Sequence, residues 1–116
     1  MAGCLFCNLI NGKIEAEVVY QNEHVFCFED INPQAPVHVL IVPKEHYQDL
    51  QGLSDAGKLS IMEEMYRAAL EVAKIKGVDE RGFRLVINNG KEGSQIILHL
   101  HLHLLGGKQI GGGMAG

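Results

Sequence analysis

At 116 residues, 47% of them hydrophobic and 21% charged, the chain has the size and composition of one globular domain with a hydrophobic core. Its formal net charge of −4, without a basic stripe, argues against nucleic acid as a partner, and no apolar run reaches the ~18 residues of a membrane span. The odd number of cysteines, three, favours a reducing compartment over a disulfide scaffold, and hence a cytoplasmic protein.

The first half of the chain predicts a short helix followed by three strands. Apolar residues at helical spacing predict the helix over 5–10. Residues 18–20 and 25–29 have the composition of two strands, and the four residues between them predict a hairpin. After a loop with two prolines, residues 37–42 predict a strong strand that a third proline ends.

The second half predicts one long helix and two more strands. Ser54 is expected to cap a helix that runs to about Lys76. Residues 83–88 and 97–105 predict strands, and residues 110–116, which are rich in glycine, predict a flexible tail. Strands joined by short turns, together with one long helix, indicate an α+β domain with an antiparallel sheet.

The last predicted strand carries the most informative pattern of the chain. Residues 97–105 read Ile-Leu-His-Leu-His-Leu-His-Leu-Leu. In a strand His99, His101 and His103 would share one face, with neighbours about 6.5 to 7 Å apart. The opposite, buried face would carry Leu98, Leu100, Leu102 and Leu104. Three imidazoles on a half-buried element predict a functional site, either a metal cluster or a catalytic triad that handles phosphate.

The histidines outside this strand differ in how strongly they indicate a site. His38 lies in the predicted strand over 37–42, where an unpaired polar side chain is costly. His24 follows Glu23 in the predicted hairpin turn. We therefore expect His24 to be an ordinary exposed imidazole and His38 to have a partner.

Cys4-x-x-Cys7 is a second signal, and it has several possible meanings. The motif is compatible with zinc ligation, with dithiol redox chemistry and with two small buried hydrophobic residues. No predicted strand precedes it, which disfavours a thioredoxin-like protein. A tetrahedral zinc site would need two more ligands, for which His46 and one histidine of the last strand are available. Cys27, between two phenylalanines, is expected in the core.

Several motifs together resemble the histidine-triad (HIT) superfamily over about residues 4–108. His99-Leu-His101-Leu-His103-Leu-Leu is similar to its His-φ-His-φ-His-φ-φ motif, and residues 30–38 are similar to its Asp-Ile-x-Pro-x-Ala-Pro-x-His segment. The match extends over further positions, namely Asn89-Gly90, Gly93, Gln95 and Leu105-Gly106-Gly107. The segment Leu105-Gly106-Gly107 resembles the Hint branch of the superfamily more than the Fhit branch.

The resemblance implies a fold and an assembly. Residues 1–116 would form a single HIT domain, with a five-stranded antiparallel sheet, one long helix and one or two short helices. In the Hint branch two such sheets join into one ten-stranded sheet, so the resemblance also implies a homodimer.

The resemblance further implies a purine nucleotide-binding hydrolase that cleaves nucleoside 5′-phosphoramidates, such as adenosine 5′-phosphoramidate, with aminoacyl-adenylates as a further candidate. Histidine suits this chemistry, because imidazole is largely unprotonated above its pKa of about 6.5 and is then a competent nucleophile. His101 would attack phosphorus and form a nucleotidyl-histidine intermediate, which water hydrolyses. His103 and His38 would hold the phosphate oxygens.

The nucleotide site follows from the same resemblance. Asp30 would bind the ribose hydroxyls, and Asn89 would assist at the phosphate or ribose. Backbone N–H groups of Ile96 and Ile97 would contact phosphate. Ile96 departs from the Ser, Thr or Glu of many Hint proteins, and an apolar side chain cannot relay a proton to a departing amine. Apolar positions match the purine slot of the family, with plain core packing as the alternative for each: Leu5, Phe6, Leu9, Ile14, Phe28 and Ile31.

Zinc is also implied by part of the family. Some bacterial members with Cys-x-x-Cys at this position bind zinc, and the matching ligands in this chain are Cys4, Cys7, His46 and His99. A zinc ion held by two thiolates and two imidazoles is coordinatively closed and therefore structural. No organic cofactor is expected.

Other functions stay open at this point. A dinucleoside polyphosphate hydrolase of the same superfamily is one alternative, and a nucleotide-binding regulatory protein with little turnover is another. A purely metal-binding module is disfavoured, because metal storage has no use for Asp30, His38 and Asn89.

Overall fold

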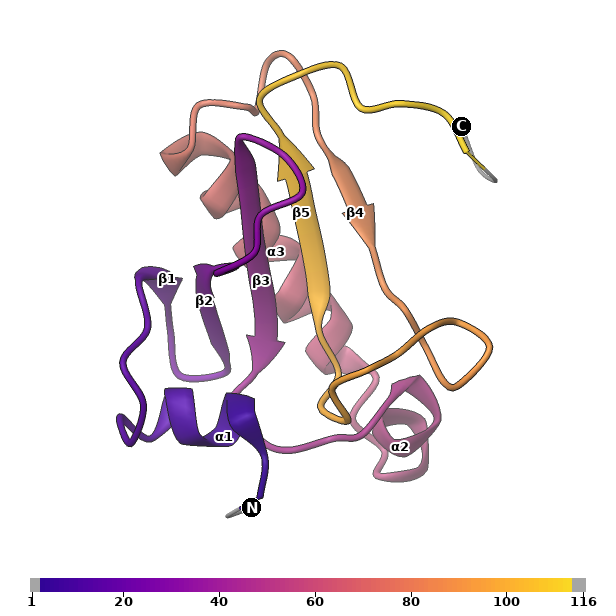
Figure 1. Cartoon of the computed structure of the whole chain (residues 1–116). Helices are drawn as coiled ribbons and strands as arrows, with labels where there is room; N and C mark the ends of the chain where they lie inside the picture. Colours follow the sequence, from indigo (N-terminus) through magenta and orange to yellow (C-terminus); the bar gives the residue numbers. More distant parts are fainter. Residues whose placement is uncertain (1–2, 114–116) are drawn as a thin grey trace.

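The computed structural model describes residues 3–113. Five strands form one antiparallel sheet in the order β1-β2-β3-β5-β4 (Figure 1). The predicted α+β class with a five-stranded antiparallel sheet is therefore confirmed. None of the helices within residues 3–113 has the length and apolar character to cross a bilayer. The elements in chain order are α1 (Leu5–Ile10), β1 (Val18–Gln21), β2 (Val25–Glu29), β3 (Val37–Pro43), α2 (Leu50–Asp55), α3 (Ser60–Ile75), β4 (Arg84–Val86) and β5 (Leu102–Gly106).

The central strand β3 is buried along its whole length and serves both faces of the sheet. Val39 and Ile41 pack with α3, which crosses behind the sheet in Figure 1. Leu40 and Val42 point to the opposite face and pack with Phe6 of α1. Because strand side chains alternate, His38 lies on the α1 face as well. This alternation brings a histidine to the face on which the functional site is built.

The single long helix predicted from Ser54 onward is two helices. Asp49 caps α2, because its Oδ1 accepts a hydrogen bond of 2.8 Å from the backbone N–H of Gly52. Ser54 therefore lies inside α2. The chain then turns at Gly57, whose φ of 70° a side chain with a Cβ rarely adopts, before α3 begins. The end predicted after Lys76 is confirmed, with the following glycine in a left-handed conformation.

The strand predicted over 97–105 is also shorter than expected, since β5 begins only at Leu102. Residues 97–101 bend away from the sheet, and the backbone N–H of Leu100 donates to the oxygen of Tyr47 at 2.7 Å. As a consequence Leu98 is 54% exposed, so its predicted burial is wrong. The remaining leucines of the pattern are buried as predicted, namely Leu100, Leu102 and Leu104.

The bounds of the other predicted elements agree more closely with the structure. The helix over 5–10 and the first three strands are confirmed, while only the middle of 83–88 pairs, as β4. Cys27 is fully buried, as predicted. Residues 110–113 belong to no helix or strand. The flexibility predicted for 110–116 stays a prediction, and Met114–Gly116 lie outside the described residues.

Candidate active site and metal centre

The three histidines of the pattern belong to two different clusters. His99 faces the cysteine motif, whereas His101 and His103 line a cleft on the α1 face of the sheet. The ring of Phe6 lies edge-on between the clusters, with its centroid 5.8 Å from that of His99 and 5.1 Å from that of His101. A continuous strand would have kept all three imidazoles on one row. The bend before β5 separates them.

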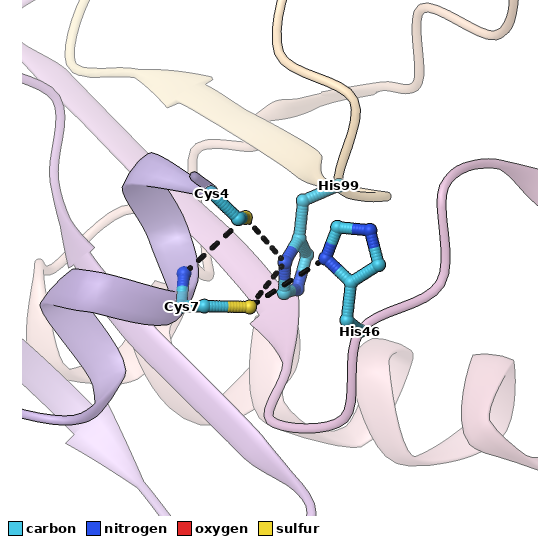
Figure 2. Close-up of side chains that lie close together, drawn as sticks. All are labelled: Cys4, Cys7, His46 and His99. Atoms are coloured by element: carbon cyan, nitrogen blue, oxygen red, sulfur yellow. Dashed lines mark hydrogen bonds between the residues drawn. The ribbon is translucent and has the colours of Figure 1, made fainter. Parts of the chain in front are cut away.

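The first cluster joins three distant segments of the chain. Cys4 and Cys7, at the start of α1, point toward His46, which follows β3, and toward His99 (Figure 2). Cys4 Sγ lies 3.3 Å from His99 Nδ1, and Cys7 Sγ lies 3.5 Å from His46 Nδ1 and 3.6 Å from His99 Nδ1. Zinc–sulfur and zinc–nitrogen bonds of normal length give a tetrahedron with sulfur–nitrogen edges of about 3.6 Å. The spacing of these four side chains therefore fits a zinc ion.

Proton positions in this cluster fit a metal as well. His99 Nε2 lies 2.9 Å from the carbonyl oxygen of Pro43, which can only accept a hydrogen bond, so Nε2 carries the proton. The lone pair of Nδ1 then faces the thiols. Such a hydrogen bond to the second ring nitrogen is usual for metal-bound histidine. Burial also lowers the pKa of His99 to about 4, which keeps the ring neutral, as ligation requires.

The cleft beside this cluster has a volume of about 1070 Å³. The structure brings the predicted catalytic residues together on its lining: His38, His101 and His103. It brings nine of the predicted nucleotide-binding residues to the same lining: Leu5, Phe6, Leu9, Ile14, Phe28, Asp30, Ile31, Ile96 and Ile97. The cleft thus combines an apolar wall with a polar row of histidines and four carboxylates, those of Glu15, Glu17, Glu29 and Asp30.

Asn89 is the predicted site residue that the structure does not bring to the cleft. Its Oδ1 accepts a hydrogen bond of 2.8 Å from the backbone N–H of Leu50, and its Nδ2 donates to Gln51 Oε1 at 2.9 Å. Asn88 lines the cleft instead. Two identical neighbours give the sequence no sign of which one faces the cleft. We therefore replace Asn89 by Asn88 as the candidate binding residue.

His101 is held in one tautomer by the backbone. Its Nδ1 lies 2.7 Å from the carbonyl oxygen of His99, which can only accept, so Nδ1 carries the proton. The ring nitrogen left for the cleft is Nε2, with a free lone pair. Burial lowers the pKa of His101, so the ring is neutral near pH 7. A neutral imidazole with a free Nε2 is a competent nucleophile.

The backbone also determines the protons of His38 and His103. The N–H of Gln34 donates to His38 Nδ1 at 3.0 Å, which places the proton of His38 on Nε2. That nitrogen donates to His103 Nδ1 at 2.9 Å, so His103 carries its own proton on Nε2. Burial lowers the pKa of His38, and lowers the pKa of His103 to about 4.

His103 Nε2 is the cleft's unsatisfied donor. This nitrogen is buried and has no hydrogen-bond partner among residues 3–113. A buried N–H without an acceptor costs about 1 to 3 kcal/mol. The ring centroid of His103 lies 5.0 Å from that of His101. An anionic oxygen next to His101 would therefore satisfy this N–H group.

Asp30, His38 and His103 also lie close enough together to surround a metal ion, but their protons oppose one. Ligation through His38 Nε2 would need a lone pair on that nitrogen. The Gln34 N–H on Nδ1 places a proton there instead, and Asp30 Oδ2, 3.4 Å away, is a second acceptor for it. Of these two clusters, only the cysteine–histidine cluster therefore has hydrogen bonds that leave a histidine lone pair facing the other ligands, as a metal site requires.

The loop from Asn88 to Ile97 is held in place by Gln95. Its Oε1 accepts from the N–H of Gly90 at 2.9 Å, and its Nε2 donates to the carbonyl oxygens of Gln48 at 2.7 Å and Ile97 at 3.1 Å. Gln95 does not line the cleft, whereas its neighbours Ser94 and Ile96 do. Ser94 was not among the residues predicted for the site, because a serine in a polar loop gives no signal in the sequence.

Comparisons with known proteins find relatives along almost the whole chain. A protein-family model described as HIT domain matches residues 11–110. The 14 kDa zinc-binding protein of Zea mays is 44% identical over 108 residues, covering 91% of this chain and 83% of that protein. The solved HIT family hydrolase from Clostridium thermocellum superposes with a TM-score of 0.93 at 38% identity, covering 98% of both chains. The histidine triad nucleotide-binding protein from Candida albicans gives 0.80 at 27% identity, covering 97% of this chain and 86% of that one.

Proposed function

The chain belongs to the HIT domain family, and we propose that it is a purine nucleotide-binding hydrolase that cleaves nucleoside 5′-phosphoramidates. The observation that carries the proposal is the tautomer of His101, whose Nδ1–H is bound to the carbonyl oxygen of His99 and whose Nε2 is free. The names of two relatives, a hydrolase and a nucleotide-binding protein, support it. Adenosine 5′-phosphoramidate is the first candidate substrate, and aminoacyl-adenylates are a further one.

The first half of the proposed reaction transfers the nucleotide to the protein. His101 Nε2 attacks the phosphorus, so a bond forms between this nitrogen and phosphorus while the phosphorus–nitrogen bond of the substrate breaks. The departing amine takes up one proton from solvent. The Nε2–H of His103 donates to a non-bridging phosphate oxygen, where charge develops in the transition state.

The second half releases the nucleotide. Water attacks the phosphorus, the bond between phosphorus and His101 Nε2 breaks, and a nucleoside 5′-monophosphate leaves. The water supplies the oxygen, and its two protons go to solvent or to the product phosphate. Two moderate displacements thus replace one difficult displacement.

The cleft also offers groups for the base and the sugar. Its apolar wall includes Leu5 and Leu9 of α1 and suits the flat face of a purine. Asp30 uses Oδ1 to accept the backbone N–H of Asn32 at 2.8 Å, and its carboxylate has further lone pairs for ribose hydroxyls. Asn88 takes the supporting role that the sequence assigned to its neighbour.

The proposal includes a structural zinc ion held by Cys4, Cys7, His46 and His99. The tetrahedral spacing of the ligand atoms supports it, as does the name of the Zea mays relative. When bound, the ion supplies a cross-link rather than chemistry, because the protein fills all four positions.

A homodimer is the proposed assembly. The support is the resemblance to the Hint branch and the position of β4 at one edge of the sheet, where a partner strand could pair (Figure 1). Sedimentation equilibrium is expected to give the mass of two 12.7 kDa chains, and a mass of one chain would contradict the dimer.

The test of the function is hydrolysis of adenosine 5′-phosphoramidate, measured together with AMP binding. His101→Ala is expected to lower kcat on the order of 10⁴-fold while AMP still binds, because the nucleophile is lost and the cleft remains. His24→Ala is the matched control, since His24 is an exposed histidine in the turn between β1 and β2, and full activity is expected. A folded wild-type protein that binds AMP without turnover would contradict the hydrolase. Faster cleavage of diadenosine polyphosphates than of the phosphoramidate would select the other hydrolase class.

A further inference from the structure

Ser94 has an unusual backbone conformation for its residue type. Its φ is 64°, and among residues 3–113 every other residue with positive φ is a glycine. A left-handed backbone is strained for a residue with a Cβ and is free of strain for glycine. Strained residues of this kind occur preferentially at functional sites. The strain at Ser94 therefore indicates a functional position.

Ser94 is one of the residues that line the cleft. Gln95 is turned away and bound to Gly90 and Gln48, so the residues on either side of it, Ser94 and Ile96, both reach the cleft lining. The lining also contains His101. The Ser94 hydroxyl makes no hydrogen bond within the described part of the chain. Ser94 is exposed, so its hydroxyl can rotate toward a ligand in the cleft.

Besides the histidines, the side-chain donors of the cleft are three amides, Asn32, Gln34 and Asn88, and the hydroxyl of Ser94. None of them has yet been given the departing amine as a partner. Ile96 is 86% exposed and lines the cleft, but its side chain has no donor or acceptor for a departing amine. Neither lysine nor arginine lines the cleft, and Ser94 carries the lining's sole hydroxyl group. His103 Nε2–H is already assigned to a phosphate oxygen, and His101 Nδ1–H is bound to the backbone.

We propose that Ser94 is a specificity-determining residue whose hydroxyl donates a hydrogen bond to the leaving nitrogen of a phosphoramidate. The proposal rests on the hydrolase function proposed above and names the part of the substrate that this side chain reads. The nitrogen gains electron density as its bond to phosphorus breaks, so a donor at that atom stabilises the transition state more than the bound substrate.

The experiment compares two adenosine 5′-phosphoryl substrates with different leaving groups. The phosphoramidate releases ammonia, a basic leaving group that needs a donor, whereas the 4-nitrophenyl ester releases 4-nitrophenolate, which needs none. Ser94→Ala is expected to lower kcat/KM for the phosphoramidate about tenfold, the effect of one lost hydrogen bond, and to change that for the ester less than twofold.

Two further variants separate the hydroxyl from the backbone. Ser94→Gly removes the hydroxyl and relieves the strain, so we expect the same selective loss together with a Tm that rises by about 3 °C. Ser94→Asn keeps a donor and tolerates positive φ, so it is expected to restore part of the activity toward the phosphoramidate.

The outcomes distinguish this inference from the function on which it rests. Equal losses on both substrates in Ser94→Ala and Ser94→Gly would indicate a structural role and overturn the inference. No loss on either substrate would overturn it as well, while turnover that depends on His101 would leave the hydrolase function intact. A wild-type protein that cleaves neither substrate would overturn both.

Discussion

At the scale of single residues, backbone groups determine where the protons of His38, His99 and His101 lie, and His38 in turn determines the proton of His103. The carbonyl oxygens of Pro43 and His99 hold a proton on His99 Nε2 and on His101 Nδ1. At His38 the backbone group is a donor instead. The N–H of Gln34 binds the lone pair of Nδ1, so the proton of the ring lies on Nε2. One residue type therefore supplies the proposed metal ligand, the proposed nucleophile and the proposed donor, because the hydrogen bonds around each ring differ.

His103 is expected to make the stability of the protein depend on pH. Its pKa is about 4 in the folded state and 6.5 without perturbation, because burial disfavours the charged ring. Between these values the unfolded chain binds the proton more readily, so the free energy of unfolding falls as the pH falls. The contribution of this one group is about 1.4 kcal/mol per pH unit, and it levels off below pH 4.

Urea unfolding at several pH values between 4 and 7 measures this slope. His103→Gln lacks the titrating ring and keeps a hydrogen-bonding side chain, so its slope is expected to be smaller by that amount. Comparing the two proteins cancels what all other groups contribute. Equal slopes in both would show that His103 titrates normally in the folded protein.

At the scale of elements, the loop before β5 depends on its attachment to α2. Asn89 binds the first N–H group of α2, while Gln95 binds the carbonyl oxygen of Gln48 just before that helix. Gly93 allows the loop to close on itself, because a Cβ there would collide with the backbone oxygen of Asn89. The loop is thus a wall of the cleft that hydrogen bonds hold in place, although it contains no helix or strand.

The two neighbouring asparagines are therefore expected to have separate effects. Asn89→Ala removes a hydrogen bond to α2 and should lower the Tm by about 4 °C, the effect of about 1 kcal/mol. Asn88→Ala should leave the Tm within about 1 °C and lower kcat/KM about tenfold, because this side chain lines the cleft. Thermal unfolding and steady-state kinetics of both variants provide the check. A loss of kcat/KM in Asn89→Ala together with a loss of Tm in Asn88→Ala would indicate that Asn89 is the binding residue.

At the scale of the whole molecule, the cysteine–histidine cluster connects parts of the chain that are far apart in sequence. Cys4 and His99 are 95 positions apart, and His46 lies between β3 and α2. The helix α1 has only six residues, too few to be stable without tertiary contacts such as this connection and the packing of Phe6. Because α1 forms one wall of the cleft, the cluster holds the cleft in shape as well as joining distant parts of the fold.

Removal of zinc is therefore expected to affect stability and binding together. Chelation should lower the Tm by roughly 10 °C and weaken AMP binding. A thiol reagent should modify none of the three cysteines in the zinc-bound protein and two after chelation, Cys4 and Cys7. Cys27 should react only on unfolding, because it is fully buried and burial raises its pKa to about 12.

Cys7→Ser is the control for these measurements, since it removes a ligand without changing the size of the side chain much. A chelator should have little further effect on its Tm. A wild-type protein whose Tm and thiol reactivity do not respond to a chelator would contradict the metal site.

The local pattern of the sequence was sufficient to predict the elements in the first half of the chain. The helix over 5–10 and the strands β1, β2 and β3 follow from apolar periodicity and turn residues, which act over a few positions. The motif residues around the cleft were identified through the resemblance to the histidine-triad superfamily, and the structure brings His38, His101 and His103 together. Such features depend on each residue's immediate neighbours, so they can be predicted from the sequence.

Only the tertiary structure decided what depends on contacts between distant segments. The hydrogen bond from Leu100 to Tyr47 lies in the segment that precedes β5, so the strand begins later than predicted and His99 lies in a different cluster from His101. The choice between Asn88 and its neighbour, like the tautomer of every histidine in the site, depends on groups that pack against it. A local pattern determines which side chains are available, and long-range packing and backbone hydrogen bonds determine which atom of each side chain faces the site.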